Sequence, residues 1–315
     1  MGDADITVEQ VTPERLPAFL TYCQTHRTVI DDSFLYDEDL RDFVPDDENP
    51  TYVAIGDTGR VVGAASVMNS AYYRRARTER FRIFHVENAD PDIYAELLAS
   101  VAMAVSGLDA LYVFVPADNA EMRNLLDALH FRIERTACVM RRNPAPVPEP
   151  DWEEGYYLRA MVFNQDEADY CLVQNLGFAH LQGSETPITL DEVARIKDSA
   201  DYIPSGVLLL YHHKEPVGVV RASRDVYEDQ PVVSIGPLAL VPGCRGQGLG
   251  RQLLRAALLV GRTQGLSTAI LSANVDNEAA TRLYASEGFR MVETVVCYTY
   301  PLPRQSRRTP APPRK

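Results

Sequence analysis

The apolar and polar positions of the chain repeat one series of predicted elements twice. In each half, the periods typical of strands and helices predict a strand, a pair of helices, three strands, a helix, a strand, a helix and a closing strand. A series that recurs at a near-constant offset indicates duplication of one unit. The matching positions are Val62-Gly63 with Val217-Gly218 (offset 155), Phe131 with Phe289 (offset 158) and Cys138 with Cys297 (offset 159).

Strands that alternate with helices predict an α/β protein, in which each mixed sheet carries helices on both faces. The stretch NPAPVPEP at 143–150 separates the two series, and its four prolines favour an extended, semi-rigid linker. We therefore expect a first domain over 1–142, a linker over 143–155 and a second domain over 156–302. Residues 303–315 are rich in proline and arginine, which predicts a disordered basic tail.

A glycine-rich stretch, CRGQGLGRQLL at 244–254, follows the apolar run 235–241. Its leucines recur at helical spacing, so the pattern predicts a helix that begins inside the glycine loop. The start of a helix offers free N–H groups and a positive dipole end, which together bind phosphate. Arg245 and Arg251 flank the loop and can add charge-assisted hydrogen bonds.

Two common nucleotide motifs do not fit this loop. Gly243 and Gly248 have the spacing of a P-loop, but Leu249 and Gly250 stand where it needs Lys and Ser or Thr. The dinucleotide fingerprint GxGxxG would need a third glycine where this chain has Arg251.

The loop instead resembles the phosphate-binding motif Q/R-x-x-G-x-G/A of the GNAT superfamily of N-acyltransferases, with Arg245, Gly248 and Gly250 at its defined positions. The stretch 274–289 is similar to the second motif of that family, N-x-x-A-x-x-L-Y-x-x-x-G-F. The resemblance spans roughly residues 235–300 and implies two GNAT folds in tandem, with acetyl-CoA as co-substrate. The positions that match the second motif are Asn277, Ala280, Leu283, Tyr284, Gly288 and Phe289.

The resemblance also implies roles for particular residues. The main chain of Leu238, Ala239 and Leu240 would pair with the pantetheine arm, and the N–H of Leu238 would stabilise the oxyanion. Tyr284 would protonate the departing thiolate as general acid. The predicted contacts of the pyrophosphate and the arm are Arg245, Gly246, Gln247, Gly248, Leu249, Gly250, Arg251 and Asn277.

The general base is less well defined. The family often uses an acid near the fourth strand, which makes Glu228 our first candidate, although a turn residue is the commoner reading of that position. Asp229, Ser234 and the histidines 180, 212 and 213 remain alternatives. No grouping has metal-ligand spacing and no motif for a covalent intermediate occurs. Direct attack of a primary amine on acetyl-CoA is therefore the expected mechanism.

The first half has diverged at the positions that would bind the cofactor. If Leu97-Leu98 is aligned with Leu253-Leu254, the stretch 85–98 has no glycine, and Asp90 and Asp92 would repel a pyrophosphate. Leu126 stands opposite Tyr284. We expect an active second domain and a structural first domain, an arrangement that resembles a tandem enzyme acting on an amino-sugar thiol precursor. The alternative is a non-catalytic acyl-CoA sensor or interaction protein.

Composition limits the kinds of binding partner and the cellular compartment that we expect for this protein. The formal net charge of −13 argues against nucleic acid and mildly favours a cationic or amine substrate. Five scattered cysteines without CxxC spacing indicate reduced thiols. No apolar run resembles a signal peptide or is long enough to span a membrane. We expect a cytoplasmic monomer or homodimer that acts on a small-molecule amine, with neither nucleic-acid nor membrane partners.

Overall fold

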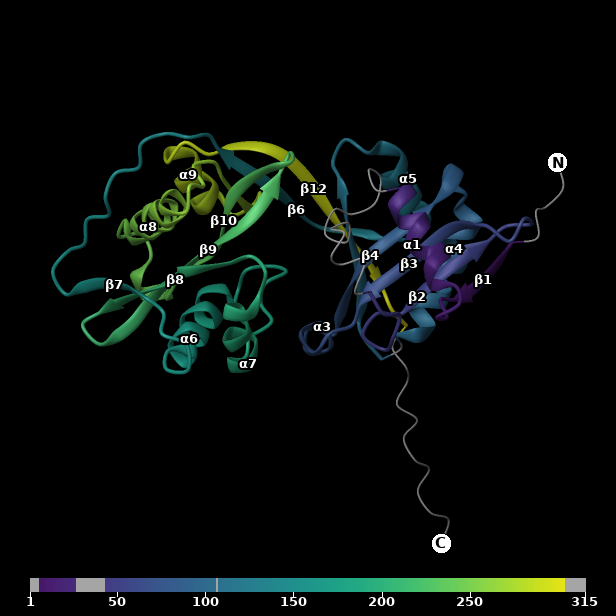
Figure 1. The fold of residues 1–315 in the computed structure, drawn as a ribbon, viewed down its shortest axis with the longest axis horizontal. Coiled ribbons are helices and arrows are strands. Elements are labelled where there is room, and N and C mark those ends of the chain that lie inside the picture. Colours follow the sequence, from purple (N-terminus) through teal and green to yellow (C-terminus); the bar gives the residue numbers. More distant parts are fainter. Residues whose placement is uncertain (1–5, 27–42, 106, 304–315) are drawn as a thin grey trace, which may run out of the picture. The chain divides into compact units, whose positions relative to one another are not determined.

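The computed structural model describes residues 6–26, 43–105 and 107–303 (Figure 1). The predicted tail lies outside the described residues from residue 304 on. The chain folds into two compact units, of which one contains residues up to Glu134 together with residues from Val296 on, and the other contains Arg135–Val295.

The first unit holds a sheet with the strand order β1-β2-β3-β4-β5-β12. One face of this sheet packs on α4 and α5, and the other packs on α1. Its elements are β1 (Thr7–Gln10), α1 (Leu16–Thr25), β2 (Thr51–Ile55), β3 (Val61–Met68), α3 (Ala71–Ala76), β4 (Thr78–Val86), α4 (Pro91–Ala104), β5 (Ala110–Pro116), α5 (Ala120–Ala128) and β12 (Arg290–Pro301) from Val296 on.

The second unit repeats this plan with the strand order β6-β11-β10-β9-β8-β7. Helices α8 and α9 pack on one face, and α6 and α7 on the other. Its elements are β6 (Arg132–Arg142) from Arg135 on, β7 (Tyr156–Ala160), α6 (Glu167–Phe178), α7 (Leu190–Ala194), β8 (Tyr202–His212), β9 (Glu215–Tyr227), β10 (Gln230–Leu240), α8 (Leu249–Thr263), β11 (Ala269–Asn274) and α9 (Glu278–Ser286).

Each sheet is completed by the closing strand of the other half of the sequence. Strand β6 follows the first series of elements, yet it pairs antiparallel with β11, and Cys138 lies in the core of the second unit. Strand β12 follows the second series, yet Val296 and Tyr298 lie in the core of the first unit. The units therefore differ from the domain limits expected from sequence by this exchange of strands.

The glycines that match between the halves have the same structural role. Gly63 on β3 is opposite Val86 of β4, and Gly218 on β9 is opposite Leu240 of β10. A Cβ atom at Gly63 would lie 3.3 Å from the side chain of Leu97, and one at Gly218 would lie 2.9 Å from that of Leu253. Glycine at both positions lets the helix pack closely on the sheet.

In each unit a parallel pair of strands opens toward its carboxyl end. Strand β4 pairs with β5 only from Thr78 to Arg80, and β10 pairs with β11 only at Val233 and Ser234. Both β4 and β10 continue for six residues past these points. The duplicated fold therefore keeps the same separation of strands in each half.

The proline-rich segment between β6 and β7 contains no helix or strand and lies in the second unit (Figure 1). The Arg142 guanidinium donates to the carbonyls of Ala145 and Pro146, the latter at 2.9 Å. Val147 is buried in the core beside α8. This segment is therefore fixed on the second unit at both points.

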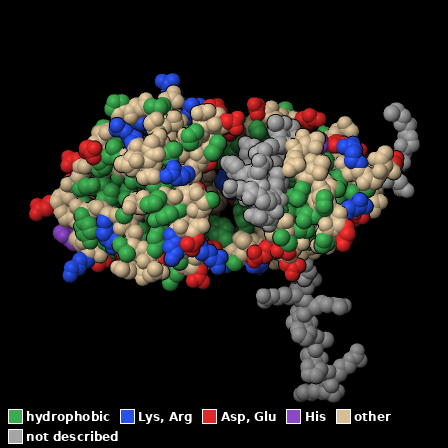
Figure 2. Space-filling model, in the orientation of Figure 1, with side chains coloured by type: hydrophobic (Ala, Val, Ile, Leu, Met, Phe, Trp, Pro, Cys, Tyr) green, Lys and Arg blue, Asp and Glu red, His purple; other side chains and the backbone are tan. Residues whose placement is uncertain are grey.

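Charged side chains of both signs are mixed on the surface. On the face drawn in Figure 2, Lys and Arg lie among Asp and Glu, and the described residues of that face form no large basic patch. Within the described residues, no helix is both long enough and apolar enough to cross a membrane.

Glu79 on β4 is fully buried, and among the described residues neither of its carboxyl oxygens has a hydrogen-bond partner. Burial raises its pKa to about 8 from 4.5, with the Arg74 charge opposing. The pKa of Glu79 is higher in the folded protein than in the unfolded chain. The stability that protonated Glu79 contributes is therefore fully present below pH 4.5 and is lost as the pH rises through about 8.

We therefore expect Glu79→Gln to gain stability over the natural chain as the pH rises from 5 to 9, by on the order of a few kcal/mol. Urea unfolding across this range measures the difference. The exposed Glu96→Gln is the control and should follow the natural chain at every pH. Parallel curves for Glu79→Gln and the natural chain would show that Glu79 ionises normally.

Candidate active site

Pro237 cannot donate a hydrogen bond in a strand ladder, and a bulge at Gly236-Pro237 lies in the middle of β10. The register with β9 shifts between Ile235, opposite Ala222, and Leu238, opposite Val220. Cross-strand hydrogen bonds alternate in antiparallel pairs. Since the Val241 N–H donates to the Val217 carbonyl at 3.0 Å, the backbone of Ala239 also faces β9.

The N–H groups of Leu238 and Leu240 consequently face the side of β11, where strand pairing has already ended at Ser234. An extended ligand with amide groups can bind there as an added strand would. This placement fits the role that the family resemblance implies for residues 238–240.

The glycine loop joins β10 to α8 through a short turn over Pro242–Cys244. Gly246 and Gly248 have φ values of +78° and +83°, which residues with a side chain rarely adopt. The Gly248 carbonyl accepts the first bonds of the helix, from the N–H groups of Arg251 and Gln252. The N–H groups of Leu249 and Gly250 precede this turn, so they are available to bind an anion at the helix start.

The arginines that flank the loop already have partners. Arg245 donates to the carbonyls of Gly177 (2.5 Å) and Leu240 (3.4 Å), which ties the loop to α6 and β10. Arg251 Nε lies 3.2 Å from Glu287 Oε1, and Arg255 binds the same carboxylate at 2.8 Å. Backbone N–H groups, more than arginine side chains, are thus free to bind a phosphate.

The neighbouring loop and helix residues support this arrangement. The Gln247 side-chain amide donates to the Gly243 carbonyl at 3.1 Å and accepts from the Tyr156 hydroxyl at 3.3 Å. Asn277 Oδ1 accepts from the Ala280 N–H at 3.3 Å and so caps α9. Only the amide nitrogen of Asn277 is left to donate to a ligand.

Tyr284 lies on the inner face of α9, 9% exposed, in the core shared with α8. Its ring centre lies 6.1 Å from that of Phe289. Burial raises the pKa of Tyr284 to about 12, so its phenol keeps its proton throughout the neutral range. A protonated phenol at this position is able to act as a general acid.

Glu228 does not lie near these residues. It occupies the turn between β9 and β10 with a φ of +50°, and its carboxylate, 62% exposed, binds Arg141 at 2.6 Å. Ten residues separate it from Leu238, which is roughly 30 Å along a strand. The structure therefore does not bring the predicted base to the predicted acid and oxyanion donor.

In the first unit, the start of α4 corresponds to the start of α8, and its N–H groups are bound by a side chain of the same unit. Asp90 Oδ1 accepts from the N–H groups of Asp92 (3.0 Å) and Ile93 (3.4 Å) at the start of α4. A carboxylate thus occupies the helix start where the second unit presents free N–H groups. The cap is a physical reason to expect that the first half does not bind a phosphate at this helix start.

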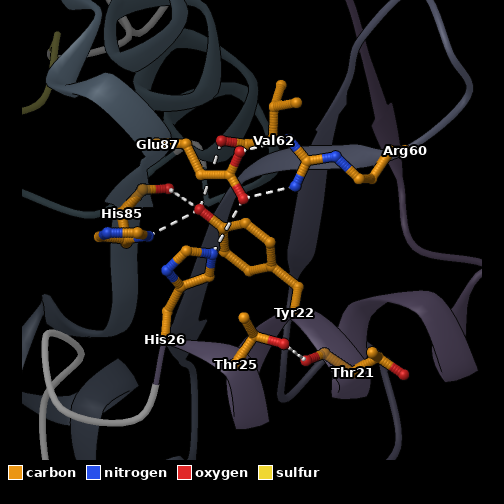
Figure 3. Close-up of polar contacts among 8 residues, drawn as sticks. All are labelled: Thr21, Tyr22, Thr25, His26, Arg60, Val62, His85 and Glu87. Carbon is orange, nitrogen blue, oxygen red and sulfur yellow. Dashed lines mark hydrogen bonds and ion pairs between the residues drawn. The ribbon is translucent and has the colours of Figure 1, made fainter.

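A polar cluster that the sequence did not reveal lies at the end of β4 (Figure 3). The Tyr22 hydroxyl is 2.6 Å from His85 Nδ1, and Glu87 binds both Arg60 (2.6 Å) and His26 Nε2 (3.0 Å). Burial chiefly lowers the pKa of His85 to about 4, so this ring is neutral. By strand register, His85 of the first unit corresponds to Ala239 of the second unit. The first unit therefore has a polar cluster at a position where the second unit has only the methyl group of an alanine.

Comparison with known proteins defines the class. Residues 177–289, which contain the glycine loop and α9, match the model of the acetyltransferase (GNAT) family. The chain is similar to this family over that segment. Among solved structures it is similar to a GCN5-related N-acetyltransferase from Sphaerobacter thermophilus, with a TM-score of 0.67, 17% identity and coverage of 94% of this chain and 96% of that one.

A tandem GNAT protein from the clavulanic acid biosynthesis pathway gives a TM-score of 0.67 at 16% identity, over 96% of this chain and all of that one. The predicted fold class, two GNAT folds in tandem, is confirmed.

Relatives in sequence include proteins named mycothiol acetyltransferase. The protein of that name from Streptomyces scabiei is 32% identical over 212 residues, which cover 65% of this chain and 66% of the relative. That from Streptomyces coelicolor is 30% identical over 209 residues, with the same coverage. Among the residues that the structure describes, no group of three or more His, Cys, Asp or Glu side chains could hold a metal ion.

Proposed function

We propose that this chain is an acetyl-CoA-dependent N-acetyltransferase that acts through its second unit on the primary amine of a mycothiol precursor. The observation that carries the proposal is the placement of four N–H groups: those of Leu238 and Leu240 face the opened side of β10, and those of Leu249 and Gly250 precede the first hydrogen-bonded turn of α8. The names of the relatives support the acceptor, and the capped helix α4 supports the choice of unit.

The reaction is a direct transfer. The amine nitrogen attacks the thioester carbonyl carbon, and the Leu238 N–H donates to the oxyanion that forms. As the C–S bond breaks, Tyr284 gives its proton to the thiolate, and the amine loses a proton to a base or to water. The products are the amide and CoA. The start of α8 holds the pyrophosphate, and the Asn277 amide nitrogen donates to the pantetheine arm.

We expect the full-length chain to release CoA from acetyl-CoA when the mycothiol precursor is present, and to bind one acetyl-CoA per chain. A thiol assay measures release, and calorimetry measures the number of sites. Binding without release would instead identify a sensor of acyl-CoA. Two sites of similar affinity would show that α4 binds phosphate despite its aspartate cap.

A further inference from the structure

One strand of the second unit carries an arginine on a face that is otherwise packed with apolar side chains. Arg221 points to the same side of β9 as Val219, which lies in the core under α6. Across the pair of strands, the residues opposite Arg221 are those of the bulge, because the register passes from Ala222 directly to Val220 between Ile235 and Leu238. Arg221 therefore lies beside the opened part of β10.

Within the described part of the chain, the hydrogen bonds of this guanidinium are made by Nη2. Nη2 donates to both carboxylate oxygens of Asp201 at 2.7 and 2.8 Å, and to Ser199 Oγ at 3.2 Å. Nε is buried and has no partner among the described residues. A buried donor without an acceptor costs free energy until something binds to it.

Helix α6, which covers this face, carries a buried hydrogen-bond acceptor that also lacks a partner among the described residues. Tyr170, Gln174 and Gly177 follow at intervals of four and three residues, so they share one stripe of α6. At one end of the stripe, burial raises the pKa of Tyr170 and the nearby charge of Arg221 opposes the rise. At the other end, a Cβ at Gly177 would lie 2.8 Å from that of Ala239 on β10.

Gln174 lies between these two contacts, about one turn from Tyr170. Its Oε1 is buried and has no hydrogen-bond partner in the described part of the chain. An unpaired acceptor on the helix thus lies over a strand that carries an unpaired donor, beside the bulge.

The bulge leaves room for a molecule to meet both groups. Gly236 belongs to a strand with neighbours on both sides, yet it is exposed, and a Cβ there would meet no heavy atom within 4 Å. Ser223 and Ser234 face each other across the same pair of strands and extend the polar lining. The sequence signal for this site is the arginine inside the otherwise apolar run 216–222, which by itself indicates only an unusual strand.

We propose that Gln174 and Arg221 position the acceptor of the reaction. Gln174 Oε1 accepts a hydrogen bond from the acceptor amine, and Arg221 Nε donates to an oxygen of the same molecule. The acceptors are therefore amines that carry a carbonyl or hydroxyl oxygen close to the nitrogen. Asp201 fixes the guanidinium plane for this contact. The inference rests on the proposed function and names the substrate class of that site.

The test measures KM for the mycothiol precursor and the acetyl-CoA affinity of the full-length chain. Gln174→Met and Arg221→Lys should each raise KM about tenfold, because each removes one hydrogen bond to the acceptor. The lysine keeps the charge beside Asp201, which protects the fold. Gln174→Glu keeps an acceptor oxygen and should restore a KM near the natural value. Acetyl-CoA affinity should not change in any of them.

A second readout compares glycinamide with ethylamine as competitive inhibitors against the precursor. The natural chain should bind glycinamide more tightly by about tenfold, and Arg221→Lys should lose this preference. The control pair is Arg224→Met and Gln264→Met, since Arg224 Nη2 binds Gln264 Oε1 at 2.7 Å on the exposed other face of β9. These two variants should behave as the natural chain does.

An unchanged KM and an unchanged preference in both Gln174→Met and Arg221→Lys would overturn the inference and leave the proposed function intact, with water as the partner of these groups. Absence of CoA release by the natural chain with the precursor would overturn the proposed function, and this inference with it.

Discussion

Replacing Tyr284 by phenylalanine should lower kcat by about 10²- to 10⁴-fold, the usual contribution of general acid catalysis. The ring keeps its place beside Phe289 in the core, and only the proton for the departing thiolate is lost. Acetyl-CoA affinity should hardly change, because an interaction made only in the transition state adds nothing to ground-state binding. Steady-state kinetics with the precursor and calorimetry with acetyl-CoA measure the two quantities.

The pH profile adds a second check on this role. With the pKa of Tyr284 raised to about 12, the natural chain should show no loss of kcat from phenol ionisation up to about pH 11. The matched control is Leu126→Ala at the corresponding position of α5, where Leu126 is fully buried. It should cost about 2–5 kcal/mol of stability and leave kcat unchanged in the folded protein. Full kcat in Tyr284→Phe, with chemistry rate-limiting, would assign the acid to another group.

Replacing Gly248 by valine should weaken acetyl-CoA binding by about 100-fold or more. At φ +83° a β-branched residue is strained, so the loop must change its path. A change of path turns the N–H groups of Leu249 and Gly250 away from the phosphate. Two charge-assisted hydrogen bonds, each worth about 1.5–3 kcal/mol, account for a loss of that size. Calorimetry measures the affinity, and circular dichroism confirms that the domain is folded.

Gly265 offers a closely matched control at the other end of α8. Its φ is +76°, and a Cβ there, as at Gly248, would meet no atom within 4 Å. Gly265→Val therefore introduces the same backbone strain far from the loop and should lower stability without lowering affinity. Equal affinities for the Gly248→Val and natural chains would mean that the loop is only a structural turn.

Much of the architecture could be predicted because it is encoded locally. The order of strands and helices, the duplication and the bulge at Gly236-Pro237 follow from side-chain period and from residues with restricted backbones. Gly248 is an example: it has a positive φ, which glycine adopts readily, so the residue type alone indicates a turn at this position.

Other features could not be predicted because they depend on distant partners. Glu228 was a reasonable base near the fourth strand, but the length of β10 carries it to the far turn, where Arg141 binds it. Asp90 was expected to repel a phosphate, yet the structure shows that it caps α4 and takes the N–H groups itself. The roles of both residues depend on partners that only the folded structure places beside them.

By itself, the sequence determined the fold class, the resemblance to a family and the half of the chain that carries the glycine loop, because motif spacing and hydrophobic period act over a few residues. Only the tertiary structure decided which sheet each closing strand completes, since β6 and β12 have equivalent patterns and either sheet satisfies their hydrogen bonds. It also decided where unpaired groups remain: the orphaned atoms of Gln174 and Arg221 result from helix packing on a strand some fifty residues away, which no local pattern records.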